Sequence, residues 1–342
     1  MKYFIILAVL ISWITACQRT ISRKSPLLSL PHEKIRKKLR LEIPTIDFSK
    51  PIDPSPLVRE YLDFFQLDYS QKSDQHFLGY INLKSGTLLS HYYKKENSRG
   101  NVLLFHGLFN HAGYMNNLIE FLLEENFSVL VVDLPGHGLS AGELFWIESF
   151  EVYENLLPEL IEFLKKETST KGPFHFIGHS TGASAIIGHL LKKKSTLFDK
   201  VILFAPLIET NSFGAGSFVI KITPSFVPYY PRFLVKTSSE ESFFTFMEED
   251  PFQPRFITTR WTKEYVKWVE SFVKLKPFNK KITVFQGDED VVLHWRKNKV
   301  HLNEKFPLMN FRLLRGSNHH IFNESEKIKK EVFSLLKKEF DS

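Results

Sequence analysis

A serine flanked by glycines is the residue of this chain whose setting most clearly suggests chemistry. Gly178-His179-Ser180-Thr181-Gly182 follows the apolar run 174–177 and precedes a run with helical spacing over 183–191. A serine on so sharp a strand-to-helix turn has a strained backbone and an exposed Oγ. The positive end of the helix also favours negative charge that develops there. The pattern predicts Ser180 as the nucleophile of an acyl-transfer reaction, and the alternative is an inert serine in a turn.

An acyl-transfer site must also donate two hydrogen bonds to the oxyanion, normally from backbone N–H groups. One predicted donor is Thr181, directly after the nucleophile. The other is Leu108, in the loop that follows the apolar strand 103–105. His106, at the start of this loop, is interpreted as a structural residue.

A carboxylate is needed to orient the base and to stabilise its imidazolium form. Asp288 and Asp290 both follow the apolar run 282–285, and periodicity cannot choose between them. Glu209, after the preceding strand, is a third candidate.

The base is expected last, in the chain order Ser, Asp, His. His319 and His320 follow the strand 311–314, and the other histidines downstream of Asp290 are His294 and His301, in a predicted helix. Adjacent side chains diverge, and no carboxylate or cysteine ligand set stands near this pair, so no metal site is expected. The reaction needs no cofactor.

Three motifs, in this order, resemble the α/β-hydrolase superfamily. They are His106-Gly107-Leu108-Phe109-Asn110-His111-Ala112-Gly113-Tyr114, Asp133-Leu134-Pro135-Gly136-His137-Gly138-Leu139-Ser140 and Gly178-His179-Ser180-Thr181-Gly182. Within the superfamily they are most similar to the monoacylglycerol lipase and lysophospholipase group, which includes hydrolases like the serine aminopeptidases. The resemblance covers roughly residues 77–340.

The resemblance also implies which candidates act. The acid comes three residues after Gly287, which is Asp290, and Asp288 is then a turn residue. The base comes three residues after Gly316, which is His319. The second motif is a structural turn in this group, so His137 and Ser140 are not in the catalytic set.

The implied activity is hydrolysis of lipid-type carboxylic esters, either monoacylglycerols or lysophospholipids, through an acyl-enzyme. Three alternatives stay open: a serine aminopeptidase, an acyltransferase, and a membrane-tethered binding protein without turnover. An aminopeptidase needs acidic groups to hold a substrate amino terminus. The candidates are Glu240, Glu241, Glu248, Glu249 and Asp250.

The elements that must position these residues form an alternating pattern from about residue 77 onward. Short β-branched or aromatic runs alternate with longer amphipathic runs, which predicts an α/β fold with a mainly parallel, eight-stranded sheet and helices on both faces. Strands are expected near 77–83, 87–93, 101–106, 127–132, 173–178, 200–205, 281–286 and 309–314, and helices near 114–125, 149–168, 181–194, 292–304 and 321–340. The candidate residues follow strand ends, where open α/β sheets build their sites.

Residues 207–278 are predicted to form a lid inserted after the sixth strand, between the core segments 77–206 and 279–342. This stretch holds 16 aromatic residues in 72 positions, against 14% for the whole chain. Apolar surface above a catalytic serine suits an acyl chain, and Phe243 and Phe244 are candidates to line such a pocket. The alternative is that the rings only attach the lid to the sheet.

The N-terminus has the layout of a signal peptide, predicted over residues 1–16. Lys2 precedes the apolar run 3–14, which is shorter than the about 20 residues that span a bilayer. Ile14-Thr15-Ala16-Cys17 resembles a bacterial lipobox, which implies that Cys17 is lipidated and binds the membrane. Gln18 rather than aspartate follows, which favours the outer membrane of the cell envelope. The alternative is an ordinary secretory signal with a chance cysteine.

Residues 17–76 are predicted to be the lipidated cysteine and a basic, proline-rich tether. Eight basic residues and one acid occupy 18–40, and 57–67 has helical apolar spacing that fits packing on the domain. The formal charge is +7 and the pI about 9.1, which favours anionic surfaces such as a membrane. No nucleic-acid-binding motif accompanies this charge, so nucleic acid is not an expected partner. Cys17 is the single cysteine, which excludes an intramolecular disulfide.

Overall fold

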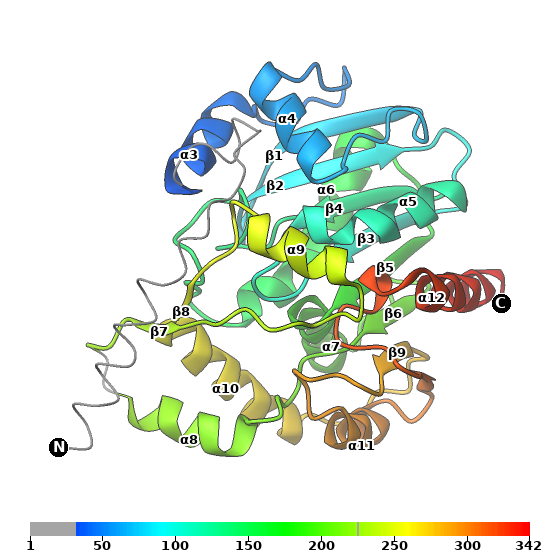
Figure 1. Cartoon of the computed structure of the whole chain (residues 1–342). Coiled ribbons are helices and arrows are strands. Elements are labelled where there is room, and N and C mark those ends of the chain that lie inside the picture. The colour runs from blue at the N-terminus through cyan, green and yellow to red at the C-terminus, as the bar shows by residue number, and fades with distance from the viewer. Residues whose placement is uncertain (1–31, 224–225) are drawn as a thin grey trace.

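The computed structural model describes residues 32–223 and 226–342 (Figure 1). The predicted signal peptide, Cys17 and Gln18 lie outside the described residues.

An eight-stranded sheet forms the centre of the molecule, in the order β1-β2-β4-β3-β5-β6-β9-β10. Its strands are β1 (Gln75–Leu83), β2 (Gly86–Lys94), β3 (Asn101–Phe105), β4 (Ser128–Val132), β5 (Phe174–His179), β6 (Val201–Phe204), β9 (Thr283–Gly287) and β10 (Asn310–Leu314). β2 pairs antiparallel with β1 and with β4, and every other pair in the sheet is parallel. The predicted mainly parallel sheet is confirmed, with each strand within two residues of its expected bounds.

Helices cover both faces of this sheet (Figure 1). On one face lie α5 (Asn116–Glu124) and α12 (Glu326–Asp341), whose Phe121 and Phe333 rings stack with centroids 4.7 Å apart. α6 (Glu151–Thr168) and α7 (Thr181–Lys193) pack together on the other face, where His189 Nδ1 lies 3.1 Å from the Glu154 carbonyl oxygen. α11 is Trp295–Lys305. Short 3₁₀ turns, Ala112–Met115 and Ile321–Asn323, precede α5 and α12, so the predicted helices 114–125 and 321–340 are each divided.

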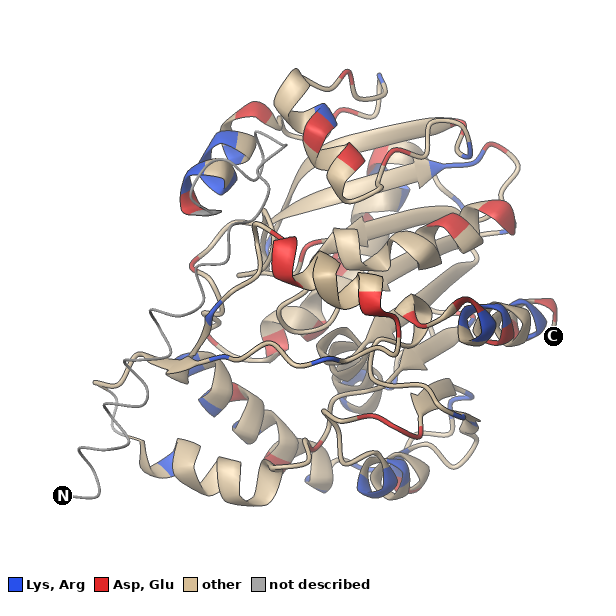
Figure 2. Cartoon of the chain, viewed as in Figure 1, with Lys and Arg blue, Asp and Glu red and all other residues tan. Residues whose placement is uncertain are grey.

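The described part of the predicted tether, from residue 32 onward, is packed on the domain. α3 (His32–Glu42) buries Ile35 and Leu39 completely, because these residues are spaced four apart on one helix face. The proline-containing stretch then pairs with β1, where Ile46 N donates to the Tyr80 carbonyl oxygen over 3.0 Å. α4 (Pro56–Phe64) packs on the core as its apolar spacing predicts. Figure 2 shows that lysines and arginines gather on α3.

The described residues of the insertion between β6 and β9 form five helices and strands. They are α8 (Phe213–Ile222), β7 (Tyr229–Pro231), α9 (Glu241–Glu249), β8 (Phe256–Thr258) and α10 (Thr259–Lys274). The aromatic rings of α10 are buried against α6, and Trp261 Nε1 and Trp268 Nε1 donate to Tyr153 and Glu154 over 3.1 and 3.0 Å. α8, in contrast, has no buried residue. The aromatic surplus of the insertion therefore serves partly as attachment and partly as exposed surface.

No helix in the described ranges 32–223 and 226–342 has both the length and the apolar character needed to cross a membrane.

Candidate active site

Ser180 lies on the tight turn between β5 and α7 and has φ 50° and ψ −111°. This left-handed backbone is strained for a residue with a side chain. The turn persists because Ser180 N donates to the Phe204 carbonyl oxygen over 2.9 Å, which ties it to β6. A Cβ on Gly178 would lie 2.6 Å from Ala183 N, and one on Gly182 would lie 2.6 Å from the Phe105 carbonyl carbon. Both flanking positions therefore require glycine.

His319 and Asp290 are brought together by the loops that follow β10 and β9. His319 Nδ1 lies 2.9 Å from Asp290 Oδ2, and both side chains are buried. The other carboxylate oxygen accepts hydrogen bonds from Val292 N and Leu293 N over 2.8 and 2.9 Å. Gln286 Nε2 donates to Oδ2 over 2.9 Å.

Burial by itself raises the pKa of Asp290, but the nearby imidazole of His319 and the donated hydrogen bonds more than offset it. The resulting pKa lies below the ordinary aspartate value of 3.8. Asp290 is therefore ionised at neutral pH and is oriented to accept a hydrogen bond from the Nδ1–H group of His319.

The competing acids have other partners. Asp288 Oδ1 accepts a hydrogen bond from Gly316 N over 2.7 Å, so it connects the two loops as a turn residue. Glu209 forms an ion pair with Lys297 at 2.7 Å, and its Oε1 lies 3.1 Å from His301 Nε2. Neither carboxylate bonds an imidazole of the 319–320 pair.

The second histidine of the pair holds two segments together. His320 Nε2 lies 3.0 Å from Asn110 Nδ2, and its Nδ1 lies 2.8 Å from Thr237 Oγ1. These contacts connect the loop after β3 to the start of the segment that leads into α9. Burial lowers the pKa of His320 well below 6.5, so this imidazole is neutral.

Ser180 and His319 meet at the same edge of the sheet, although within the described residues no hydrogen bond joins Ser180 Oγ to the imidazole. The residue before Ser180 connects the two loops instead, because His179 Nε2 lies 3.1 Å from the His319 carbonyl oxygen. The His179 and His319 rings are 4.9 Å apart. Ser180 is only 5% exposed, which describes a closed site. Catalytic hydrogen bonds of free enzymes often tighten only when substrate binds.

The two N–H groups predicted to receive an oxyanion lie on loops that are bonded together. Gly182 N donates to the His106 carbonyl oxygen over 3.1 Å, which docks the start of α7 against the loop after β3. A Cβ on Gly107 would lie 3.1 Å from the Ser180 Cβ, so the loop after β3 runs alongside Ser180. Among the described residues, neither Leu108 N nor Thr181 N has a hydrogen-bond acceptor.

His106 is structural, in agreement with its interpretation from sequence. Its Nε2 accepts a hydrogen bond from Leu134 N over 2.9 Å, and its Nδ1 lies 2.8 Å from the Gly107 carbonyl oxygen. The Asp133–Ser140 loop is also structural. Asp133 accepts hydrogen bonds from Ala112 N and Leu139 N over 2.7 and 2.8 Å. These bonds hold the segment after β3 against the Asp133–Ser140 loop.

A buried polar network between the insertion 207–278 and the segment 109–114 after β3 is not predicted by the sequence. Asp250 Oδ2 lies 2.9 Å from the Tyr114 hydroxyl and 3.2 Å from His111 Nε2. The guanidinium of Arg232 lies 3.9 Å from the centre of the Phe109 ring, directly after Leu108. No local signal connects residues so far apart in the chain, and Asp250 was considered only as a possible ligand for a substrate amino group.

A comparison of the sequence with family models finds a match to the family described as serine aminopeptidase, S33, over residues 96–326. Phospholipase YtpA of Bacillus subtilis is 24% identical over 250 residues, which covers 69% of this chain and 93% of that protein. Monoglyceride lipase of Rattus norvegicus is 27% identical over 138 residues, which covers 40% of this chain and 45% of that enzyme.

Solved structures show the same fold. A soluble variant of monoglyceride lipase from Saccharomyces cerevisiae, in complex with a substrate analogue, has a TM-score of 0.68 at 18% identity and covers 77% of this chain and 94% of its own. Monoacylglycerol lipase from Paleococcus ferrophilus has a TM-score of 0.62 at 21% identity and covers 74% of this chain and 98% of its own. The chain therefore has the α/β-hydrolase fold.

Proposed function

Because the chain belongs to the serine aminopeptidase S33 family of α/β hydrolases, we propose that it cleaves carboxylic esters of lipids through the residues Ser180, His319 and Asp290. The observation that carries the proposal is the 2.9 Å contact between His319 Nδ1 and Asp290, at the sheet edge where Ser180 occupies its strained turn. A lipase or esterase is the kind of hydrolase that the family and its relatives indicate.

The proposed reaction is acyl transfer to water. His319 Nε2 removes the hydroxyl proton of Ser180 as the Ser180 Oγ attacks the ester carbonyl. Asp290 accepts a hydrogen bond from His319 Nδ1–H and stabilises the imidazolium. The N–H groups of Leu108 and Thr181 donate to the oxyanion. His319 then protonates the leaving alcohol, and a water molecule releases the acyl group by the reverse proton transfers.

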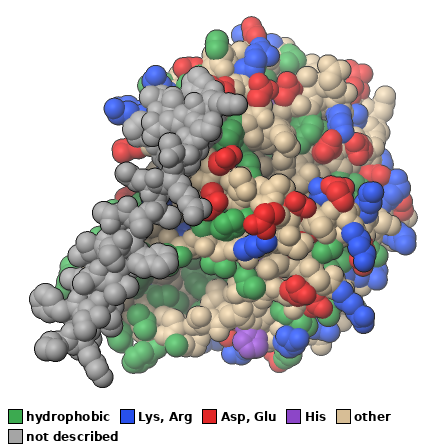
Figure 3. Space-filling model, viewed as in Figure 1, with side chains coloured by type: hydrophobic (Ala, Val, Ile, Leu, Met, Phe, Trp, Pro, Cys, Tyr) green, Lys and Arg blue, Asp and Glu red, His purple; other side chains and the backbone are tan. Residues whose placement is uncertain are grey.

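Two features support a lipid ester as the substrate, either a monoacylglycerol or a lysophospholipid. Phe243 packs beside His320, with ring centroids 4.9 Å apart, which brings an aromatic ring of α9 close to the base loop. Large apolar side chains are also exposed on and after α8: Phe218 is 64% exposed and Phe226 is 84% exposed. Figure 3 shows hydrophobic side chains gathered in the region of α8. Surface of this kind is typical of proteins that contact lipid.

The first test is labelling with a fluorophosphonate, which reacts with an activated serine. The full chain in neutral detergent is compared with Ser180→Ala and with Ser217→Ala, a control on the exposed part of α8. We expect labelling of wild type and of the control, and none of Ser180→Ala. Hydrolysis of p-nitrophenyl esters of increasing length, a monoacylglycerol and a lysophospholipid then defines the substrate. A folded wild type that is not labelled would contradict the proposal and favour a binding protein without turnover.

A serine aminopeptidase is the second candidate, since the description of the family names this activity. The lid acids give it little support. Asp250 is buried and bonded to Tyr114, and Glu241 pairs with Lys236. Faster turnover of an amino-acid anilide than of an ester would establish the peptidase. A product acylated on an added alcohol, in place of free acid, would instead identify an acyltransferase.

We also propose that Cys17 is lipidated and holds the protein on the bacterial cell envelope, with the outer membrane favoured by Gln18. The support is the sequence Ile14-Thr15-Ala16-Cys17 alone, because these residues lie outside the described ranges. Cys17→Ala should move the protein out of the membrane fraction. Full retention of that variant would refute the lipid anchor.

A further inference from the structure

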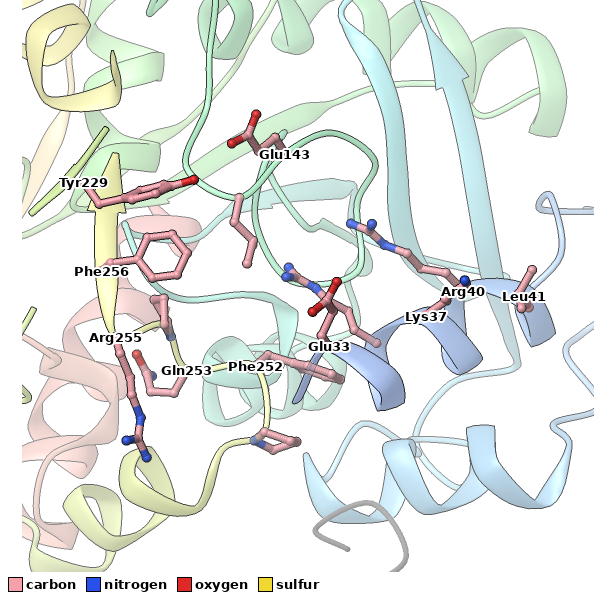
Figure 4. Close-up of a pocket in the computed structure, with 14 residues that line it drawn as sticks. Glu33, Lys37, Arg40, Leu41, Glu143, Tyr229, Phe252, Gln253, Arg255 and Phe256 are labelled. Carbon is pink, nitrogen blue, oxygen red and sulfur yellow. The ribbon is translucent and has the colours of Figure 1, made fainter. Parts of the chain in front are cut away.

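A cavity of about 930 Å³ lies outside the candidate active site, between α3 and the lid segment 251–256 (Figure 4). None of Ser180, Asp290, His319, Leu108 and Thr181 lines it. Its walls come from α3, from residues 143–144 in the loop before α6, from β7 and β8, which pair antiparallel, and from residues 251–255 before β8. Its volume is in the range of sites for small organic ligands.

The lining of this cavity is amphipathic. Apolar surface is provided by Leu144, Tyr229, Phe252 and Phe256. Among the described residues, the charged ones that line the cavity are four cations, Arg36, Lys37, Arg40 and Arg255, and two carboxylates, Glu33 and Glu143. The lining therefore has a net charge of +2 beside an aromatic wall, which suits a molecule with an anionic group and an apolar chain.

Among the described residues, the basic side chains of the lining form no close ion pair. Arg36 and Arg40 are one helical turn apart, and their guanidinium groups donate only to backbone carbonyl oxygens, Arg36 Nε to Gly138 over 2.8 Å and Arg40 Nε to Leu139 over 3.0 Å. Across the described residues, no carboxylate lies within 4.0 Å of either guanidinium, and Lys37 and Arg255 form no ion pair. Burial and then the charge of Arg40 lower the pKa of Arg36 to about 10. An anion in the cavity would relieve this repulsion.

We propose that this cavity binds an anionic phospholipid, with the phosphate beside the basic side chains of α3 and the start of an acyl chain against the aromatic wall, while Arg255 adds positive charge on the opposite wall. The alternative occupant of the cavity is the part of the chain that precedes α3, and charge favours the phospholipid over it. Residues 18–31 carry Arg19, Arg23 and Lys24 and no acid, so they would add to the positive charge. The proposal concerns binding only and does not depend on hydrolysis at Ser180.

The chain offers a matched pair of variants for the test. Lys37 and Lys38 are adjacent on α3 and both exposed, but only Lys37 lines the cavity. Lys37→Glu and Lys38→Glu change the net charge equally, so a difference between them reports the cavity and not the general attraction of a basic helix for anions. Arg255→Glu tests the opposite wall, and melting temperatures check that each variant is folded.

Binding is measured by calorimetry on the full chain in neutral detergent, with Ser180→Ala in every protein so that no lipid is hydrolysed. The probes are dihexanoyl phosphatidylglycerol, dihexanoyl phosphatidylcholine and inorganic phosphate. We expect phosphatidylglycerol to bind best, a loss of at least about tenfold in affinity for Lys37→Glu and for Arg255→Glu, and no change for Lys38→Glu.

Four results would overturn the proposal. Equal binding of phosphatidylcholine would mean that the cavity does not select an anion, and equal binding of inorganic phosphate would make the lipid unnecessary. Equal losses for Lys37→Glu and Lys38→Glu would indicate diffuse attraction to the whole helix. Binding that is absent in the full chain and gained when residues 18–31 are deleted would show that this segment is the occupant.

Discussion

Replacing Asp290 with asparagine tests the proposed base and acid most directly, and the structure determines how the amide must sit. Oδ1 accepts hydrogen bonds from Val292 N and Leu293 N, so the asparagine oxygen has to take this position. The amide NH₂ then occupies the place of Oδ2, facing Gln286 Nε2 and His319 Nδ1. Gln286 is a donor there, so two donors face each other.

The NH₂ group also forces the wrong tautomer on the base. His319 can meet an N–H donor only with an unprotonated Nδ1, which places its proton on Nε2, where the lone pair is needed to deprotonate Ser180. We expect kcat to fall about 10⁴-fold, which corresponds to about 5.4 kcal/mol in the activation free energy, with KM nearly unchanged.

The assay is the initial rate of p-nitrophenyl butyrate hydrolysis at pH 8, together with the rate of fluorophosphonate labelling. Asp288→Asn is the matched control, because its amide oxygen can keep the hydrogen bond from Gly316 N, and we expect a loss of less than about threefold. A loss at Asp288→Asn as large as at Asp290→Asn would refute the assignment of the acid. So would an Asp290→Asn enzyme that keeps more than about a tenth of the wild-type rate.

Three further predictions follow from the same contacts. Phe243→Ala should reduce the rate on a decanoyl ester at least about tenfold more than on an acetyl ester, because Phe243 lies beside His320 and Tyr114; equal losses on both esters would remove Phe243 from the acyl site. Gly107→Ala should abolish labelling in a folded protein, because the new Cβ would lie 2.8 Å from His179 Nδ1 and 3.1 Å from the Ser180 Cβ; normal labelling would mean that the loop can move away. Burial lowers the pKa of His76 and of His137 to about 4, so each binds its proton above that pH only when the chain unfolds. The contribution of each histidine to the free energy of unfolding is complete above the ordinary pKa of 6.5 and is lost as the pH falls toward 4, at up to about 1.4 kcal/mol per pH unit. A melting temperature as high at pH 5 as at pH 7 would contradict this.

The nucleophile turn and the sheet could be predicted because their signals are local. Apolar runs of four to six residues end at polar loops, and the turn at Ser180 needs glycines on both sides at fixed offsets. Eight strands and five helices of the core follow from such patterns, since hydrophobic period and turn chemistry act over a few neighbouring residues. The family resemblance adds the order of the motifs and the spacing of the acid and the base from Gly287 and Gly316. These two features predict Asp290 and His319.

Only the tertiary structure decides which carboxylate meets which imidazole. Asp288 and Asp290 lie in one loop two residues apart, and their side chains diverge because Asp288 bonds Gly316 while Asp290 is held by Val292 and Leu293. The sequence also does not predict that α3 packs on the domain. Its basic residues dominate the composition of the segment, while Ile35 and Leu39 make up a narrow apolar face whose partners lie far along the chain.

The amino-acid sequence by itself therefore determined the parallel sheet, the turn that carries Ser180, and the order in which an acid and a histidine follow it. Tertiary structure decided the Asp290–His319 contact, the bonds of His320 and Asp250 between lid and oxyanion loop, and the cavity beneath α3. The physical reason is the range of the interactions. Backbone turns and hydrophobic periodicity are encoded within a few residues, whereas buried hydrogen bonds and cavities depend on segments that meet only when the whole chain has folded.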